Sequence, residues 1–216
     1  SWTAQDGDAE AELIAFAEHV LTSPAVAEIM TAWVARTTSP VRTATLATKA
    51  LQLTLPGVAD VYQGTETTAV ALVDPDNRRP VDHEPLAEVL QRLDEGTKPV
   101  GLGEEKLRLT AAILRLRREV PEAFVGARAG YAALPTSTGH AIAYARTLDE
   151  EPRVCVVVKR LPIALAAVGG WGEGTVVLPE GTWSDVVSGA TYDGGARTLA
   201  KMLAEAPVAV LARVVE

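Results

Sequence analysis

The sequence predicts an α/β segment followed by an all-β segment: the closing part of a (β/α)8 TIM barrel, then a C-terminal antiparallel β-sandwich. Three observations predict this order. Apolar residues recur at helical spacing through the first half of the chain. One short β-prone run, 58–63, lies alone among those helices. After Pro121 the pattern changes to short strands separated by turn signals. We therefore expect two domains, 1–122 and 123–216.

Caps and prolines mark the expected helix starts. Asp6 or Asp8 can cap a first helix, and the Ser-Pro pair at 23–24 marks the start of a second. The Ser-Pro pair at 39–40 repeats that signal, so a third helix is expected there, with a stop at the Pro-Gly pair of 56–57.

Two further helices are expected, a short one at 86–93 and a longer one at 104–120 that Pro121 ends. The longer helix has an apolar face and a basic face. Its expected inward residues are Leu107, Leu109, Ile113, Leu116 and Val120, and its expected outward residues are Arg108, Arg115, Arg117 and Arg118.

The lone strand at 58–63 is the unusual element. A strand among helices cannot pair its own backbone groups, so its neighbours must come from elsewhere. In α/β barrels the loop that follows a strand faces the active site. The polar loop of 65–85 is therefore the place where chemistry is expected.

The second half has the spacing of an antiparallel sandwich, with turn signals between short strands. The expected strands are 131–134, 140–146, 153–159, 175–178, 183–187 and 208–215, and one of the turns between them is 193–195. Cys155 lies in the apolar run 154–158, where a buried structural thiol is expected rather than a nucleophile.

Composition excludes several classes of partner. The formal net charge is −8, which argues against nucleic acid, because a protein that follows phosphates needs a basic face. No apolar stretch approaches the ~18 residues of a membrane span, so no membrane is expected. The first residues have neither the basic start nor the apolar run of a signal peptide, and one cysteine fits a reducing compartment, so we expect a cytoplasmic location. Because no initiator Met is present, the chain is expected to be part of a longer protein.

The loop after the lone strand is rich in side chains that bind sugar hydroxyls: carboxylates, amides and guanidinium groups, with Tyr62 available for stacking. They are Gln63, Glu66, Asp74, Asp76, Asn77, Arg78, Arg79, Asp82 and His83. A solvated loop tied down by its own Asp–Arg pairs is the alternative, and composition alone does not decide between the two.

Other sites are weaker. Asp74 opens a run like a calcium loop, but Arg79 stands where glycine is needed, so no metal and no cofactor is expected. Trp171 and Trp183 lie near turns and could stack on sugar rings, which leaves a carbohydrate-binding module open, although packing roles are preferred for both.

Two motifs carry a resemblance. The segment Pro56-Gly57-Val58, followed by Tyr62-Gln63-Gly64-Thr65-Glu66, resembles the eighth barrel strand of the α-amylase superfamily, glycoside hydrolase family 13. The run from Leu72 to Asp82, LVDPDNRRPVD, resembles the maltooligosyltrehalose synthase family within it. The similarity covers essentially the whole chain but only the C-terminal portion of family members. The family's catalytic carboxylates lie on earlier strands, so no catalytic residue is assigned here, and a fragment of a related hydrolase remains an alternative.

The resemblance implies an isomerase of the intramolecular transferase class, a (1->4)-alpha-D-glucan 1-alpha-D-glucosylmutase. Such an enzyme converts the reducing-end α-1,4 bond of a maltooligosaccharide, derived from starch or glycogen, to an α,α-1,1 (trehalosyl) bond. The implied partners are that sugar and the remainder of the barrel, and the isolated chain is expected to be inactive. The residues expected to contact or position sugar are Gln63, Glu66, Asp76, Asn77, Arg78 and Arg79.

Overall fold

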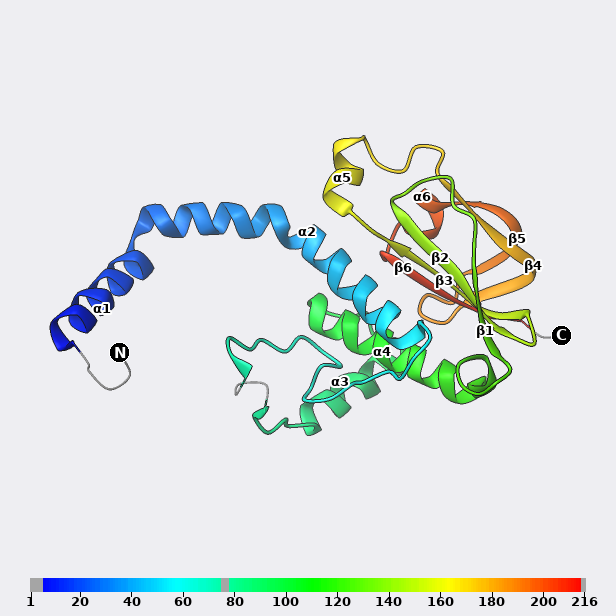
Figure 1. The fold of residues 1–216 in the computed structure, drawn as a ribbon, viewed down its shortest axis with the longest axis horizontal. Helices are drawn as coiled ribbons and strands as arrows, with labels where there is room; N and C mark the ends of the chain where they lie inside the picture. The colour runs from blue at the N-terminus through cyan, green and yellow to red at the C-terminus, as the bar shows by residue number, and fades with distance from the viewer. Residues whose placement is uncertain (1–5, 75–77, 215–216) are drawn as a thin grey trace. The chain divides into compact units, whose positions relative to one another are not determined.

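Helices fill the first half of the chain and strands the second, in the predicted order (Figure 1). The computed structural model describes residues 6–74 and 78–214. The chain divides into two compact units, 1–41 and 42–216, and the division falls within one long helix.

The first unit contains α1 (Gly7–Thr22) and the beginning of α2 (Pro24–Thr54). The predicted cap of α1 is confirmed: the Asp6 carboxylate accepts the backbone N–H of Ala9 at 3.2 Å. No residue of α1 is buried. Among the described residues no single helix is long and apolar enough to cross a membrane, although α1 and α2 meet that test as a pair bent by 61°.

The predicted helix start at 39–40 is wrong, because α2 continues through Pro40. A proline inside a helix removes one backbone donor but need not end the helix when neighbouring groups hold the adjacent turn. Here Thr37 donates its hydroxyl to the Trp33 carbonyl at 2.9 Å, and Thr38 does the same to Val34 at 2.8 Å.

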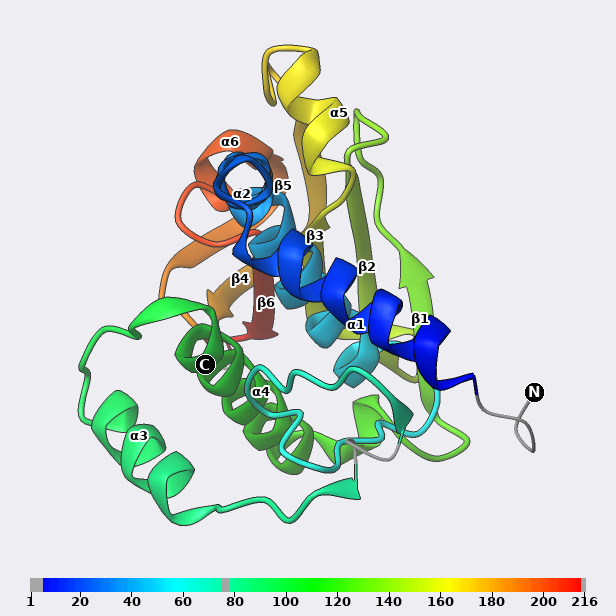
Figure 2. The ribbon, with the colours of Figure 1, turned by 90° about the vertical axis from the view of Figure 1, so that its left-hand side faces the viewer.

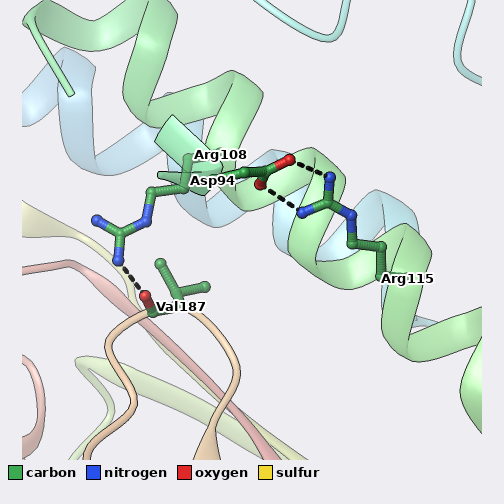
Figure 3. A network of polar contacts seen from close by, with 4 residues as sticks. All are labelled: Asp94, Arg108, Arg115 and Val187. Carbon is green, nitrogen blue, oxygen red and sulfur yellow. Dashed lines mark hydrogen bonds and ion pairs between the residues drawn. The ribbon is translucent and has the colours of Figure 1, made fainter. Parts of the chain in front are cut away.

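The second unit adds α3 (Glu84–Asp94) and α4 (Gly101–Glu119), which lie side by side (Figure 2). Arg115 of α4 donates hydrogen bonds to both carboxylate oxygens of Asp94, at 2.6 and 2.7 Å (Figure 3). The predicted inward face of α4 is buried, except for Val120, which follows the helix and is half-buried.

Two of the arginines expected to point outward do not. Arg108 is half-buried and donates to the Val187 carbonyl. Arg117 is half-buried, donates to the Leu53 carbonyl at 2.8 Å and lies 4.6 Å from the Phe124 ring centre. Because the last carbonyls of α2 have no partner inside their own helix, a guanidinium from α4 can satisfy one of them.

Six strands form one antiparallel sheet in the order β1-β2-β3-β6-β4-β5. They are β1 (Ala129–Ala133), β2 (Ala141–Leu148), β3 (Glu151–Lys159), β4 (Thr175–Asp185), β5 (Thr191–Thr198) and β6 (Val208–Arg213). Short helices precede three of the strands: η2 (Pro121–Ala123) before β1, α5 (Pro162–Ala167) before β4 and α6 (Leu199–Met202) before β6.

The predicted strands at 175–178 and 183–187 are one strand, β4, and β5 replaces the turn predicted at 193–195. The register of β4 against β5 shifts between Leu178 and Thr182, which is the mark of a bulge. A Cβ on Gly194 would lie 2.5 Å from the Pro179 carbonyl oxygen. Glycine therefore permits the close approach of the two strands here, and it does not mark a turn.

The strands β2, β3 and β6 in the middle of the sheet are buried on both faces. On β3, Val154, Val156 and Val158 face one core, and Cys155 and Val157 face another. The first core is completed by α2 and α4, and the second by β4 and α6 (Figure 1). The sheet curls over the second core, since Thr136, after β1, bridges to Val176 of β4. One continuous curled sheet thus stands where two packed sheets were expected, and the sandwich is not confirmed.

The boundary expected between residues 122 and 123 remains a prediction. The first core contains residues from both sides of it, including Ile113 and Val156. Buried Arg146 of β2 joins the two sides, since it donates to the carbonyls of Ala123 and Phe124, each at 3.1 Å.

Candidate functional site

Residues 58–63, expected to form a barrel strand, form no strand in the described chain. Burial still alternates along the segment as in a strand: Val58 is 96% exposed, whereas Ala59 and Val61 are half-buried against the first core. A strand needs a neighbour to accept and donate its backbone hydrogen bonds. No such neighbour lies beside it among residues 6–74 and 78–214, so the prediction of a strand is wrong for this chain by itself.

A tight turn follows. Gln63 and Gly64 have φ of +53° and +75°, the left-handed region that favours glycine. The N–H of Thr65 donates to the Tyr62 carbonyl at 3.0 Å, and that of Thr67 to Gly64 at 3.2 Å. A Cβ on Gly64 would lie 3.1 Å from a methyl carbon of Val81, so glycine also lets the turn approach the far side of the loop.

Two of the predicted sugar-binding residues share one hollow. Gln63 and Arg79 both line a cavity of about 360 Å³ between the turn and the start of α3. That volume is at the lower end of the range for small-molecule sites. Asp82 also lines it, and its carboxylate accepts the N–H of Glu84, at the start of α3, at 3.1 Å. The hollow therefore joins residues that are 16 positions apart in the sequence.

Arg78 is placed differently. Its guanidinium pairs with the Asp74 carboxylate at 2.8 Å, and the side chains are 77% and 73% exposed. This pair fits the solvated-loop alternative, and exposed pairs of this kind contribute little to stability. Asp76 and Asn77 lie outside the described residues.

Glu66 does not line the hollow. One of its carboxylate oxygens, Oε2, is buried without a hydrogen-bond partner, and the carboxylate interacts with the ammonium groups of Lys49 and Lys106. Burial lowers the pKa of both lysines, and the attraction of Glu66 opposes that shift. The Glu66 carboxylate thus acts on both lysines as a nearby opposite charge.

The two lysines escaped the sequence analysis, although a signal for each was present. Lys49 stands three residues after Leu46 and one before Ala50, on the inward stripe of α2. Lys106 precedes Leu109 and Thr110 of α4 by three and four residues. A lysine on an inward stripe must find a counter-charge, because an unpaired buried ammonium is costly.

Three residues for which the sequence favoured a structural role are buried or half-buried. Burial raises the pKa of the Cys155 thiol to about 12, which leaves it unreactive. Trp183 is fully buried and donates its indole N–H to the Pro179 carbonyl at 2.9 Å, so its ring is not available for stacking on a sugar. Trp171 is half-buried, with the Lys159 ammonium 5.9 Å from its ring centre.

Larger hollows lie elsewhere in the second unit, among them one of about 730 Å³ between β5 and α6 and one of about 520 Å³ where α4 meets the turn after β4. Arg108 closes one side of the smaller, donating to the Val187 carbonyl (Figure 3). None of the predicted site residues lines either of them.

No protein-family model matches the chain. Two curated proteins of Mycobacterium tuberculosis, from strains CDC 1551 and H37Rv, are 37% identical to it over 218 aligned positions and carry the name maltooligosyl trehalose synthase. The match covers 99% of this chain and 26% of theirs. The solved structure of maltooligosyltrehalose synthase from Arthrobacter ramosus is 36% identical, with a TM-score of 0.87, over 99% of this chain and 28% of that one.

The predicted resemblance to the maltooligosyltrehalose synthases is confirmed. The chain spans about a quarter of the length of the synthases that it matches, and corresponds to a C-terminal portion of them. A solved glycosyltrehalose synthase, 22% identical with a TM-score of 0.75, shares the fold. Agreement with the synthases runs through both the helices and the sheet, since the match covers nearly the whole chain.

Proposed function

We propose that the chain is the C-terminal part of a maltooligosyltrehalose synthase of glycoside hydrolase family 13. In such an enzyme it would complete a (β/α)8 barrel with the segment of 58–63. The observation that supports this is the match at 36–37% identity and a TM-score of 0.87 over 99% of the chain. Missing barrel neighbours would also account for a strand-like alternation of burial in a segment that has no partner.

The proposed reaction is an isomerisation. The bond from the anomeric carbon of the penultimate glucose to O4 of the reducing-end glucose breaks, and a bond to the anomeric oxygen of that same glucose forms. The first product is a covalent glycosyl-enzyme, and the released glucose turns and attacks it. No water is consumed, so the released glucose must be held and water must be excluded.

This chain would supply the groups that hold the sugar, and the nucleophile and the acid would come from earlier strands. Retaining chemistry needs two carboxyl groups about 5–5.5 Å apart across the scissile bond. Glu66, engaged with two lysines, is unsuited to that task. The residues proposed to contact or position the sugar are Gln63, Glu66, Asp76, Asn77, Arg78 and Arg79.

A chimera tests the proposal: the matched portion of the Arthrobacter ramosus enzyme is replaced by this chain, and the product is incubated with maltopentaose. We expect loss of reducing ends with little free glucose, which is the outcome of transfer without hydrolysis. The upstream portion alone serves as control and should be inactive. Release of shorter reducing sugars, with no non-reducing product, would instead support a related hydrolase.

A further inference from the structure

The segment of 60–67 is anchored at both of its ends by side chains from two helices. At the front, Gln52 of α2 donates its amide to the Asp60 carbonyl at 2.6 Å, and Lys49 donates to the Gln52 amide oxygen at 2.6 Å. At the rear, Lys106 of α4 donates to the Thr67 carbonyl at 2.8 Å. The anchors therefore tie one short segment to both α2 and α4.

The charges of these anchors form one group. Lys49 is only 4% exposed, and the two ammonium groups repel each other, which adds to the cost of burying them. The Glu66 carboxylate offsets this cost for both lysines. The carbonyl oxygen of Glu66 lies 3.4 Å from the hydroxyl of Thr110 on the same helix as Lys106, and that hydroxyl makes its shorter hydrogen bond, 2.7 Å, to the Lys106 carbonyl.

Packing supports the same position of the segment on α4 independently of charge. A Cβ on Gly103, in the first turn of α4, would lie 2.8 Å from the hydroxyl oxygen of Thr67 and 3.2 Å from that of Thr68. Glycine at this position thus allows the rear of the segment to lie directly on α4.

We propose that Lys49, Lys106 and Glu66 are positioning residues that fix the segment of 60–67 and thereby set where Tyr62 and Gln63 lie. Tyr62 is 51% exposed, and Gln63 lines the 360 Å³ hollow, so the anchored segment carries both side chains to the surface of the proposed sugar site. The catalytic part of this proposal rests on the proposed function.

The expected consequence is a change in product, since a small misplacement of a group that holds a reactant can cost about a hundredfold in rate. Transfer needs the released glucose to be held, whereas hydrolysis needs only water. A loosened segment should therefore lower trehalosyl formation more than it lowers bond cleavage, and the share of free glucose should rise.

The anchor itself is tested on the 216-residue chain by amide hydrogen exchange of Thr65 and Thr67. Lys106→Met should speed their exchange by about tenfold, the equivalent of one lost hydrogen bond, whereas Lys106→Arg, which retains a donor, should restore it. Glu66→Gln should act like Lys106→Met. Lys201→Met, a change at an exposed position on α6, is the matched control and should have no effect. Unchanged exchange in both Lys106→Met and Glu66→Gln overturns the proposal.

The catalytic consequence is tested in the chimera with the same variants. A raised ratio of glucose to trehalosyl product in Lys106→Met, restored by Lys106→Arg, supports positioning. Equal loss of both products with no change in their ratio counts against it, because a purely structural lysine would behave in that way. If the unsubstituted chimera makes no trehalosyl product, the proposed function fails, and hydrogen exchange in the chain still decides whether the anchor exists.

Discussion

The sheet and the segment of 58–72, which follows α2, both contain β-branched and other apolar residues. Such residues are buried in the sheet, whereas several of those in the segment are exposed. In the sheet, residues 154–158 of β3 are buried on both faces, between antiparallel partners β2 and β6. In the segment, Val58, Val70 and Leu72 are 96%, 96% and 92% exposed. β-branched residues favour strands because they pack against neighbouring strands, so the favourable term disappears where no neighbour exists. The availability of partner strands thus separates the two regions.

The same contrast extends to polar groups. In the sheet, Arg146 is buried and its guanidinium donates to two carbonyls. In the loop after residues 60–67, Arg78 and Asp74 form an ion pair in which both side chains are largely exposed. The strands of the sheet find their partner strands within this chain. The proposed function places the segment in a barrel whose other strands come from outside this chain.

The largest expected effect on stability comes from shortening one side chain in each of the two regions. Trp183→Ala removes a fully buried side chain and should lower the free energy of unfolding by about 3–5 kcal/mol, whereas Val58→Ala should change it by less than about 0.5 kcal/mol. Urea denaturation of both variants measures the difference. In the chimera, where barrel strands would cover Val58, the cost of Val58→Ala should rise to about 1–3 kcal/mol. A cost that stays near zero there would break the comparison.

The stability of the fold at alkaline pH tests the burial of Tyr144, a residue of β2 whose hydroxyl contacts α2. The Tyr144 hydroxyl lies 2.6 Å from that of Thr54, and burial raises the pKa of Tyr144 to about 12, from an ordinary value of 10.0. Between those pH values the unfolded chain loses the proton and the folded chain keeps it, so stability falls as pH rises. The fall assigned to Tyr144 is about 3 kcal/mol.

Tyr144→Phe is the matched control. At neutral pH it should cost about 1 kcal/mol, for the lost hydrogen bond to Thr54. Above pH ~10 it should show a shallower decline than the wild type, because the ionisable group is gone, whereas buried Cys155 titrates in both proteins. Unfolding by urea at a series of pH values measures this. Parallel declines in the two proteins would mean that Tyr144 is not protected from ionisation.

The sequence predicted those elements whose signals are local. The Asp6 cap, the inward face of α4 and the runs of β2 and β3 depend on spacing and on neighbouring residues, and all were found. Pro40 and Gly194 misled because each signal has two meanings: proline can sit inside a long helix, and glycine can mark close approach instead of a turn. The motifs identified the loop, but Lys49 and Lys106 were missed, because their electrostatic attraction to Glu66 joins parts of the chain that only folding brings together.

The smallest expected effect on stability is also the sharpest test of the loop. Arg78 forms an exposed ion pair with Asp74 on its own loop, so Arg78→Ala should change the free energy of unfolding by less than about 0.5 kcal/mol. If Arg78 holds sugar, the same change in the chimera should still lower trehalosyl formation and raise the share of free glucose. Asp74→Ala separates the alternatives, since it breaks the same ion pair and leaves the guanidinium in place. If the pair merely ties the loop together, the two variants should give the same products; if Arg78 binds the sugar directly, only Arg78→Ala should shift them. Products unchanged in both variants would remove Arg78 from the site.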